Sequence, residues 1–400
     1  MISSGAFVLK ILILTFYYKP DLCAGSFRSK AFIDALQPLL TGDDSVDIIT
    51  TMPNRYKSFR REAAAFEEDG QIRIVRVQLP HHQSGFLDQS RAFSTYMLGA
   101  LSYTRRRNYD VVFATSSRLF TAFLGAIIAR RKGVPLYLDI RDIFTDTMKS
   151  LLPVPLSRVI LPLFFLIERF TLSTADKVNL VSEGFRDYFR TIASQKAFSY
   201  FTNGIDEEFI DFSFHKENFT PKKVITYAGN IGQGQGLEKI IPAIAKMTEN
   251  ENEFWIVGDG GMRSSLEDAL KIKGVTNVTL YDPVHREELL EIYKQSDYLF
   301  LHLNDCPAFE KVLPSKIFEY AATNKPIIAG VSGFAGNFIQ ERIDNSAVFT
   351  PCDHEDFIRK YRSLSNENGN RKEFVEEYIS TNIMQRMARD FIEFSQQGLP

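Results

Sequence analysis

The stretch KKVITYAGNIGQGQGLEKIIPAIAKM, residues 222–247, joins a strand pattern to a helix pattern through a loop rich in glycine. Its first part, KKVITYAGN, predicts a strand, and its last part, GLEKIIPAIAKM, predicts a helix. Between them, Gly232, Gly234 and Gly236 allow an anion to approach the amides of a helix N-terminus, whose dipole attracts negative charge. The stretch therefore predicts an α/β unit with a phosphate-binding loop; the alternative is a glycine-rich turn without a ligand.

The same alternation of strands and helices is found on both sides of this stretch. Before it, strand patterns are LKILILTF, VDIITT, IRIVRVQL, YDVVFATS and PLYLDIRD, with helical patterns such as SFRSKAFIDALQPLL between them. After it, the strand patterns are NEFWIVGDG, NVTLYD, SDYLFLHL, KPIIAGV and SAVFT. Continuous apolar strands separated by helices predict parallel sheets covered on both faces. We therefore expect two doubly wound α/β units in tandem, joined near residues 200–209.

Length and composition agree with two ordinary globular domains. The chain has 400 residues, of which 44% are hydrophobic and 24% charged, and its net charge of -2 gives no reason to expect a nucleic-acid partner. Cys23, Cys306 and Cys352 provide neither a disulfide framework nor a zinc site, which favours a reducing cytosol. No apolar run reaches the ~20 residues of a spanning helix. We therefore expect a cytoplasmic protein without a structural metal.

A second motif, VLPSKIFEYAATNKPII, residues 312–328, predicts another helix start with charge. Lys316 lies in the expected first turn, against the preference of the helix dipole, which indicates that an anion binds there. Glu319 follows three residues later on the same face, and its carboxylate could accept the two hydroxyls of a ribose. The alternative is a local surface ion pair.

A third motif, FWIVGDGGMRSSLEDAL, residues 254–270, predicts a strand, a glycine turn and a helix. The turn is placed to border a base or ribose, and Arg263 at the helix start could reach a phosphate. Asp259 is better explained as a turn or cap residue than as a catalyst.

Taken together, the segments YAGNIGQGQGLEKII, FWIVGDGGMRSSL and LPSKIFEYAATNKPII resemble the nucleotide-sugar half of family 4 GT-B glycosyltransferases, in the bacterial cell-surface polysaccharide subgroup that includes fucosamine transferases. The first half is similar through YYKPDLCAGSFRS, LYLDIRDIFTD, VSEGFRDYF and FTNGIDEEF. The resemblance implies two Rossmann-like domains facing across a cleft, residues 1–203 with a returning helix 376–400, and residues 204–375. It also implies retaining transfer from a UDP- or GDP-sugar without a metal or other cofactor.

In the first half, the resemblance implies roles for four residues. Gly25, on the loop after the first strand, is expected to approach the diphosphate through its backbone, and Arg28 to reach toward the same group. Arg141 and Asp142 are expected at the cleft floor, in contact with the transferred sugar or the acceptor.

In the second half, the resemblance implies that Gly232, Gly234 and Gly236 line the diphosphate, that Lys316 pairs with its β-phosphate and that Glu319 holds the ribose. Asn230 and Gln235 stand where many relatives have cations, so Lys316, with Arg28 or Arg263, is expected to neutralise more of the charge. Asn230 and Asp259 complete the set of expected donor-site residues.

Two basic segments with interleaved aromatic residues predict an anionic membrane surface as a partner, and hence a lipid-linked saccharide acceptor on the inner face of the plasma membrane. They are NRYKSFRREAAAF, residues 54–66, and SYTRRRNYD, residues 102–110. The alternative is a solvated helix face with a charged cap. Two other functions stay open, a nucleotide-sugar-binding protein without activity and a dinucleotide-dependent oxidoreductase or epimerase, although the glycines lack G-x-G-x-x-G spacing.

Overall fold

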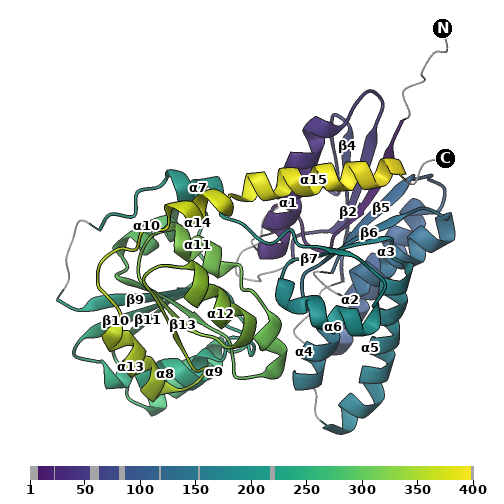
Figure 1. The fold of residues 1–400 in the computed structure, drawn as a ribbon. Helices are drawn as coiled ribbons and strands as arrows, with labels where there is room; N and C mark the ends of the chain where they lie inside the picture. Colours follow the sequence, from purple (N-terminus) through teal and green to yellow (C-terminus); the bar gives the residue numbers. More distant parts are fainter. Residues whose placement is uncertain are drawn as a thin grey trace. The chain divides into compact units, whose positions relative to one another are not determined.

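The chain folds into two compact units, each with its own sheet of mostly parallel strands (Figure 1). The computed structural model describes residues 8–21, 23–54, 63–80, 86–116, 119–151, 154–216 and 221–397. The N-terminal unit comprises Met1–Thr202 and Thr381–Pro400, and the C-terminal unit comprises Asn203–Ser380. The expectation of two doubly wound α/β units is confirmed.

The sheet of the N-terminal unit has the strand order β3-β4-β2-β1-β5-β6-β7-β8. Its neighbouring strands pair in parallel, except that β3 and β4 form an antiparallel hairpin. The strands are β1 (Lys10–Leu14), β2 (Ser45–Thr51), β3 (Phe66–Asp69), β4 (Ile72–Val77), β5 (Val111–Thr115), β6 (Leu136–Ile140), β7 (Lys177–Leu180) and β8 (Phe198–Ser199). The helices are α1 (Ala24–Leu36), α2 (Phe86–Thr104), α3 (Leu119–Lys132), α4 (Phe144–Leu151), α5 (Val154–Thr174), α6 (Arg186–Ile192) and α15 (Ser380–Gln397).

Helices cover both faces of this sheet because its central strands are apolar on both sides. On one face, Phe32 of α1 stacks on Phe113 of β5 with ring centroids 4.4 Å apart. Phe391 of α15 contacts both rings, so the last helix, yellow in Figure 1, packs beside α1. On the other face, Gly125 allows α3 to lie close to β5, since a Cβ there would stand 2.5 Å from the Cβ of Ala114.

The sheet of the C-terminal unit is parallel throughout its described strands, in the order β11-β10-β9-β12-β13-β14. The strands are β9 (Lys223–Ala228), β10 (Asn252–Val257), β11 (Val278–Tyr281), β12 (Tyr298–His302), β13 (Ile327–Gly330) and β14 (Ser346–Phe349). The helices are α7 (Glu207–Asp211), α8 (Leu237–Met247), α9 (Arg263–Ile272), α10 (Arg286–Gln295), α11 (Lys316–Ala322), α12 (Gly333–Arg342), α13 (His354–Ser363) and α14 (Lys372–Glu377).

Strand β12 shows how this second sheet divides two apolar cores. Tyr298 and Phe300 face the core that includes α8, α9 and α13. The alternate residues Leu299 and Leu301 face the core that includes α10, α11 and α12. A strand buried on both faces holds its loops firmly at its carboxyl end, where ligands bind in open parallel sheets.

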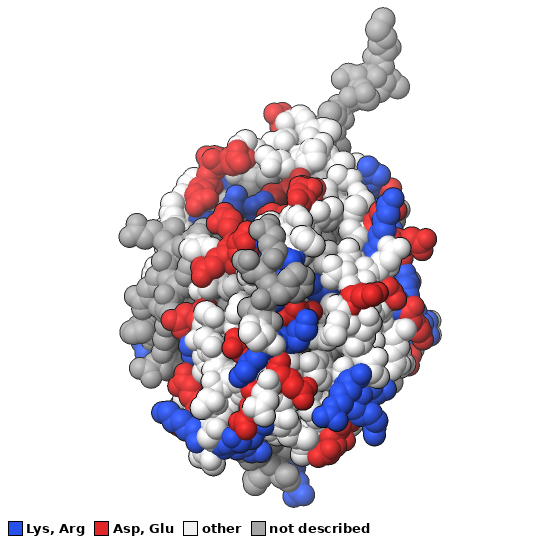
Figure 2. All heavy atoms as spheres, turned by 90° about the vertical axis from the view of Figure 1, so that its left-hand side faces the viewer, with Lys and Arg blue, Asp and Glu red and all other residues white. Residues whose placement is uncertain are grey.

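The mixed surface charge agrees with the net charge of -2, and the helices agree with the absence of a long apolar run in the sequence. On the face shown in Figure 2, Lys and Arg side chains are interspersed with Asp and Glu side chains. Among the described helices, none has the length and apolar character required to cross a membrane.

Candidate active site

The glycine loop lies where the sequence predicts it, between β9 and α8. Gly236 precedes the helix in the left-handed region, with φ of +60°, a conformation that glycine adopts without steric cost. Within the loop, the Asn230 side chain donates to Gln235 Oε1 at 2.9 Å, and the amide of Gly232 donates to the same atom at 3.2 Å. Asn230 and Gln235, which stand in place of cations, therefore hold the shape of the loop.

The second glycine turn, after β10, packs directly on the first. Gly258 has φ of +143°, and a Cβ there would stand 1.9 Å from the carbonyl oxygen of Gly229. The amide of Ile231 donates to the carbonyl of Asp259 at 2.9 Å. The Asp259 side chain accepts from the next amide, that of Gly260, at 2.8 Å. These contacts are those of a turn residue, and they join two of the predicted motifs at one edge of the sheet.

Lys316 and Glu319 start α11 and form an ion pair of 2.6 Å. Their side chains are 24% and 14% exposed, so ligand can reach them. The Tyr320 hydroxyl accepts from the amide of Ala228 at 3.1 Å, which places α11 at the carboxyl end of β9, beside the glycine loop. A local ion pair between these residues is the alternative to anion binding that the sequence left open. The pair lies at the edge of the sheet where a ligand is expected.

Arg286, the first residue of α10, joins this cluster and was missed by the sequence analysis. Its guanidinium lies 3.8 Å from Glu319 and 2.5 Å from Asp206. Burial lowers the pKa of Arg286, but the two carboxylates outweigh it and the net shift is upward. A cation at the first residue of a helix is the signal that identified Lys316, and it would have identified Arg286 as well.

Arg263 is engaged with the protein rather than directed outward. Its guanidinium donates to the carbonyls of Gly258 at 2.6 Å and Tyr281 at 3.1 Å, and pairs with Asp282 at 3.1 Å. These contacts tie together the ends of β10 and β11. Its expected contact with phosphate stays a prediction.

In the N-terminal unit, a buried cluster forms around Asp139, the fourth residue of β6. Arg28 makes a two-pronged contact with this carboxylate, at 3.0 and 2.9 Å, and Arg141 adds a third bond at 3.0 Å. Burial alone would raise the pKa of Asp139, but the two guanidinium groups lower it overall. The cluster is a structural ion network of the kind that is costly to break.

Arg28 is engaged with the protein in this cluster. Its side chain, 4% exposed, also donates to the carbonyls of Phe201 and Thr202 at 2.6 and 2.7 Å, so the guanidinium is held inside the unit. Its expected contact with the diphosphate stays a prediction. Arg141 is held similarly, since it donates to the carbonyl of Gly25 at 2.7 Å. Gly25 itself lies in the first turn of α1 and not in the loop before it.

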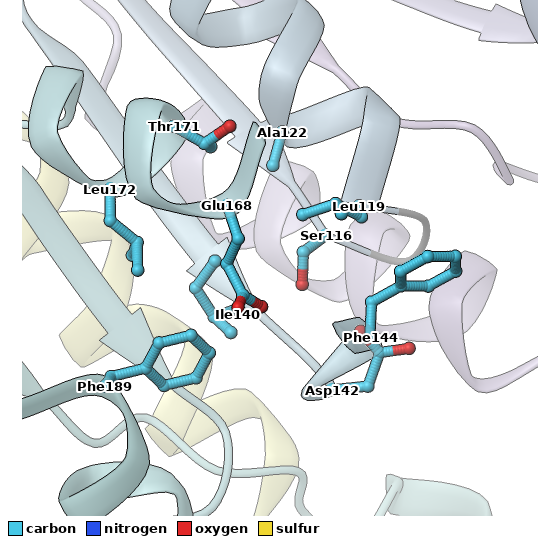
Figure 3. A pocket seen from close by; sticks show the side chains of 10 residues that line it. All are labelled: Ser116, Leu119, Ala122, Ile140, Asp142, Phe144, Glu168, Thr171, Leu172 and Phe189. Carbon is cyan, nitrogen blue, oxygen red and sulfur yellow. The ribbon is translucent and has the colours of Figure 1, made fainter. Parts of the chain in front are cut away.

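Asp142 follows this cluster and lines a small pocket with Glu168 of α5 (Figure 3). Figure 3 shows the carboxyl group of Glu168 projecting toward the middle of a mostly apolar lining. Tyr188 donates to Glu168 Oε2 at 2.5 Å, whereas Asp142 Oδ1 is buried and accepts no hydrogen bond from any described residue. Burial raises the pKa of each carboxyl to about 7. A hydroxyl group of a ligand would satisfy Asp142.

Ser116, at the end of β5, also lines this pocket. Its hydroxyl accepts from the amide of Arg141 at 2.8 Å. Glu168 and Tyr188 were not among the predicted residues.

The expected membrane-binding segments are described only in part. The basic residues at 55–62 lie outside the described residues. Arg105, Arg106 and Arg107 are exposed just after α2, and Arg107 stacks on Tyr103 at 3.7 Å. Among the described residues, no group of three or more His, Cys, Asp or Glu could hold a metal ion.

A second surface feature is the outer side of α5, which exposes large apolar residues. Leu163 and Leu166 are 56% and 61% exposed, and Leu156 and Phe165 are exposed on the same helix. Exposed apolar residues gathered on one element are typical of an interaction surface.

Comparison with known proteins agrees with this architecture. The model "Glycosyl transferases group 1" matches residues 209–380, and "Glycosyl transferase 4-like domain" matches residues 40–197. A curated protein of Escherichia coli (strain K12), WcaI, which is named for glycosyl transfer in colanic acid biosynthesis, is 24% identical over 339 residues, covering 78% of this chain and 81% of its own.

Solved structures share the fold across both units. Anabaena Alr3699/HepE, in complex with UDP, matches with a TM-score of 0.63 and 15% identity, covering 96% of this chain and 100% of that one. WaaG, a glycosyltransferase involved in lipopolysaccharide biosynthesis, matches with a TM-score of 0.64 and 12% identity, covering 95% of each chain.

Proposed function

The chain belongs to family 4 of the GT-B glycosyltransferases, and from this premise we propose that it transfers a sugar from a UDP- or GDP-sugar to a lipid-linked saccharide in cell-surface polysaccharide synthesis. The observation that carries the proposal is the glycine loop of the C-terminal unit with Lys316 and Glu319 at the same edge of the sheet. The name of the Escherichia coli relative and the UDP complex of the Anabaena protein support the same direction.

In this proposal, the diphosphate of the donor binds the loop amides and the ammonium group of Lys316. The Lys316–Glu319 pair opens as the ligand arrives, because the ammonium turns to the phosphate and the carboxylate accepts the ribose hydroxyls. When the bond from the sugar to the diphosphate breaks, negative charge grows on the leaving phosphate, and a fixed cation stabilises it. Lys316 and the loop supply that charge, and the sugar is transferred with retention of its configuration.

On the acceptor side, we assign the role to Asp142 rather than to Arg141. The Arg141 guanidinium is held by Asp139, Gly25 and Ser29, so it keeps the loop after β6 in place. Asp142 has a buried oxygen without a partner among the described residues, in a pocket at the carboxyl ends of β5 and β6. An acceptor hydroxyl that enters this edge would donate to Asp142.

The proposal includes peripheral binding at the inner face of the plasma membrane, through the exposed apolar side of α5. Leu163 and Leu166 would enter the boundary between headgroups and acyl chains, while the exposed Arg158 and Arg169 meet anionic headgroups. The inner side of the same helix carries Glu168 into the pocket with Asp142. One helix thus connects the proposed membrane surface to the proposed acceptor site.

The first test measures transfer and hydrolysis with a panel of UDP- and GDP-sugars, and nucleotide binding by calorimetry. Lys316→Ala is expected to weaken binding of the preferred nucleoside diphosphate by about 1.5–3 kcal/mol, the value of a charged hydrogen bond. Lys246→Ala is a matched control, because Lys246 forms a similar pair with Glu249, three residues later at 2.7 Å, at the far end of α8.

Unchanged nucleotide affinity in Lys316→Ala would overturn the assignment of the donor site. Binding of sugar nucleotides without transfer to any saccharide or hydrolysis would instead indicate a nucleotide-sugar-binding protein.

A further inference from the structure

We propose that His302 and Asn304 are positioning residues that turn the amides of the glycine loop toward the diphosphate of the donor. The inference rests on the proposed function of this loop and adds the device that orients it. Neither residue belongs to the motifs that the sequence analysis singled out for donor binding.

His302 ends β12 and Asn304 follows it, and together they hold three consecutive carbonyl groups of the loop. The Asn304 side chain donates to the carbonyl of Gln233 at 3.0 Å, and the Asn304 amide donates to that of Gly234 at 2.8 Å. His302 Nδ1 lies 2.6 Å from the carbonyl of Gln235. All three carbonyls therefore point toward the end of β12.

The direction of the carbonyls fixes the direction of the amides. In a planar trans peptide, the C=O of one residue and the N–H of the next point in opposite directions. The amides of Gly234, Gln235 and Gly236 consequently point away from β12. The amide of Gln235 closes the turn by donating to Gly232 at 3.0 Å. Among the described residues, nothing accepts from the amides of Gly234 and Gly236.

These two amides are suited to an anion. Gly236 is buried, and its N–H has no acceptor among the described residues, which is a costly state for a buried backbone donor. Two convergent amides at the start of an eleven-residue helix are the donors that diphosphate oxygens accept from. The chemical class of the ligand is thus a phosphate ester. The base and the sugar of the donor are recognised by other residues.

The tautomer of His302 is set by its second partner. The amide of Cys352 donates to His302 Nε2 at 2.9 Å, so Nε2 is the acceptor and Nδ1 carries the hydrogen that Gln235 accepts. The ring is fully buried beside Phe300 and Phe349, and this burial lowers the pKa of His302 to about 4. The imidazole is neutral at ordinary pH. Through its two hydrogen bonds it joins the glycine loop, at Gln235, to the segment after β14, at Cys352.

Two substitutions of His302 test its two hydrogen bonds one at a time, because each variant keeps one bond and removes the other. His302→Asn places an amide N–H near the position of Nδ1 and keeps the bond to Gln235, whereas His302→Gln places an oxygen near Nε2 and keeps the bond to Cys352. We expect the Kd of the preferred nucleoside diphosphate to rise about tenfold in His302→Gln, the effect of one lost hydrogen bond, and less than about threefold in His302→Asn. The Kd of the matching nucleoside, which lacks phosphate, stays unchanged in both.

Asn304→Ala is an independent test of the proposal. It removes the side-chain hydrogen bond to the carbonyl of Gln233, while the hydrogen bond from the Asn304 amide to the carbonyl of Gly234 remains. We expect a smaller rise in the same Kd, again without effect on the nucleoside. Both His302 variants lose thermal stability, and that loss alone does not support a positioning role.

The proposal is overturned if the two His302 variants bind the nucleoside diphosphate equally well, or if nucleoside and diphosphate weaken in parallel. Failure of the proposed function would look different, because the unaltered protein would then bind no nucleoside diphosphate.

Discussion

The two units hold their cations in opposite ways. In the N-terminal unit, Arg28 and Arg141 share the buried carboxylate of Asp139 and also donate to backbone carbonyls. In the C-terminal unit, Lys316 and Arg286 share the carboxylate of Glu319, and each side chain is more than 20% exposed. The first arrangement fixes the fold, and the second leaves cations that a ligand can take over.

The difference shows that residue type and position near a helix start do not decide a role. Arg28 and Lys316 both lie near the start of a helix that follows a strand, and the sequence alone assigned both to phosphate. Burial distinguishes them, because a cation removed from water must be paired permanently, while an accessible cation can exchange its partner at little cost.

The largest expected effect breaks the buried cluster. Arg28→Ala leaves Asp139 with one guanidinium partner and leaves the carbonyls of Phe201 and Thr202 without their donor. We expect the free energy of unfolding of the N-terminal unit to fall by about 3–5 kcal/mol, measured by urea denaturation. Lys316→Ala, by contrast, should change it by less than about 1 kcal/mol. Equal losses would contradict the distinction between the two units.

A second variant tests how firmly the donor loop is built. Gly258→Ala places a Cβ against the carbonyl of Gly229 at a backbone angle that L-residues avoid, and should destabilise the C-terminal unit by about 2–4 kcal/mol. Gly261→Ala, three residues later, meets no atom within 4 Å and should stay within about 0.5 kcal/mol of the unaltered protein. Thermal unfolding of both compares a packed glycine with an open one; similar melting temperatures would show that the two loops do not pack as described.

The parts of the site that the sequence could predict are local. The strand, glycine loop and helix at 222–247, and the pair of Lys316 and Glu319, depend on residues a few positions apart. The partners of Arg28 could not be predicted in this way, since Asp139 is 111 positions away and Phe201 is 173. Only the topology of the sheet brings them together.

Other misses had a signal in the sequence. Strand β3 has the charged sequence FEED, of low strand propensity, but the Asp69-Gly70 step before Ile72 is a hairpin signal. Glu168 lies four residues from both Phe164 and Leu172 on α5, so a carboxyl occupies the buried stripe of the helix. A charged residue at such a position indicates a polar pocket.

The carboxyl groups of the two units also differ in their surroundings. Glu319 forms ion pairs in the C-terminal unit, whereas burial raises the pKa of Glu168 and Asp142 in the N-terminal unit, so stability should depend on pH. Burial raises the pKa of Glu168 from 4.5 to about 7, and it raises the pKa of Asp142 although the charge of Arg141 opposes that shift. An acid whose folded pKa is raised contributes stability below its unfolded pKa and loses it as the pH rises through the folded pKa.

Stability of the N-terminal unit should therefore fall between about pH 4.5 and pH 7, by up to about 3 kcal/mol for Glu168. Glu168→Gln should remove the part of this slope that Glu168 contributes, while Asp142 keeps its own part, and the variant should be more stable than the unaltered protein at pH 8. Glu373→Gln, on the exposed surface of α14, is the control and should leave the slope unchanged. Urea denaturation at a series of pH values measures it, and an identical slope in both variants would contradict the pocket as described.

The smallest effect on folding is expected on the exposed side of α5, where the two units differ in apolar surface. Leu163→Ser and Leu166→Ser alter side chains that are more than half exposed, so each should change stability by less than about 0.5 kcal/mol. If α5 binds a bilayer, the double variant should nevertheless lose flotation with vesicles that contain phosphatidylglycerol, because the buried apolar area is removed. Ile272→Ser, at a still more exposed apolar residue of α9, should float as the unaltered protein does. Flotation that survives the double variant would remove α5 from the proposed membrane contact and leave the basic segments as the remaining candidates. If the unaltered protein does not float even at low salt, membrane binding itself is overturned.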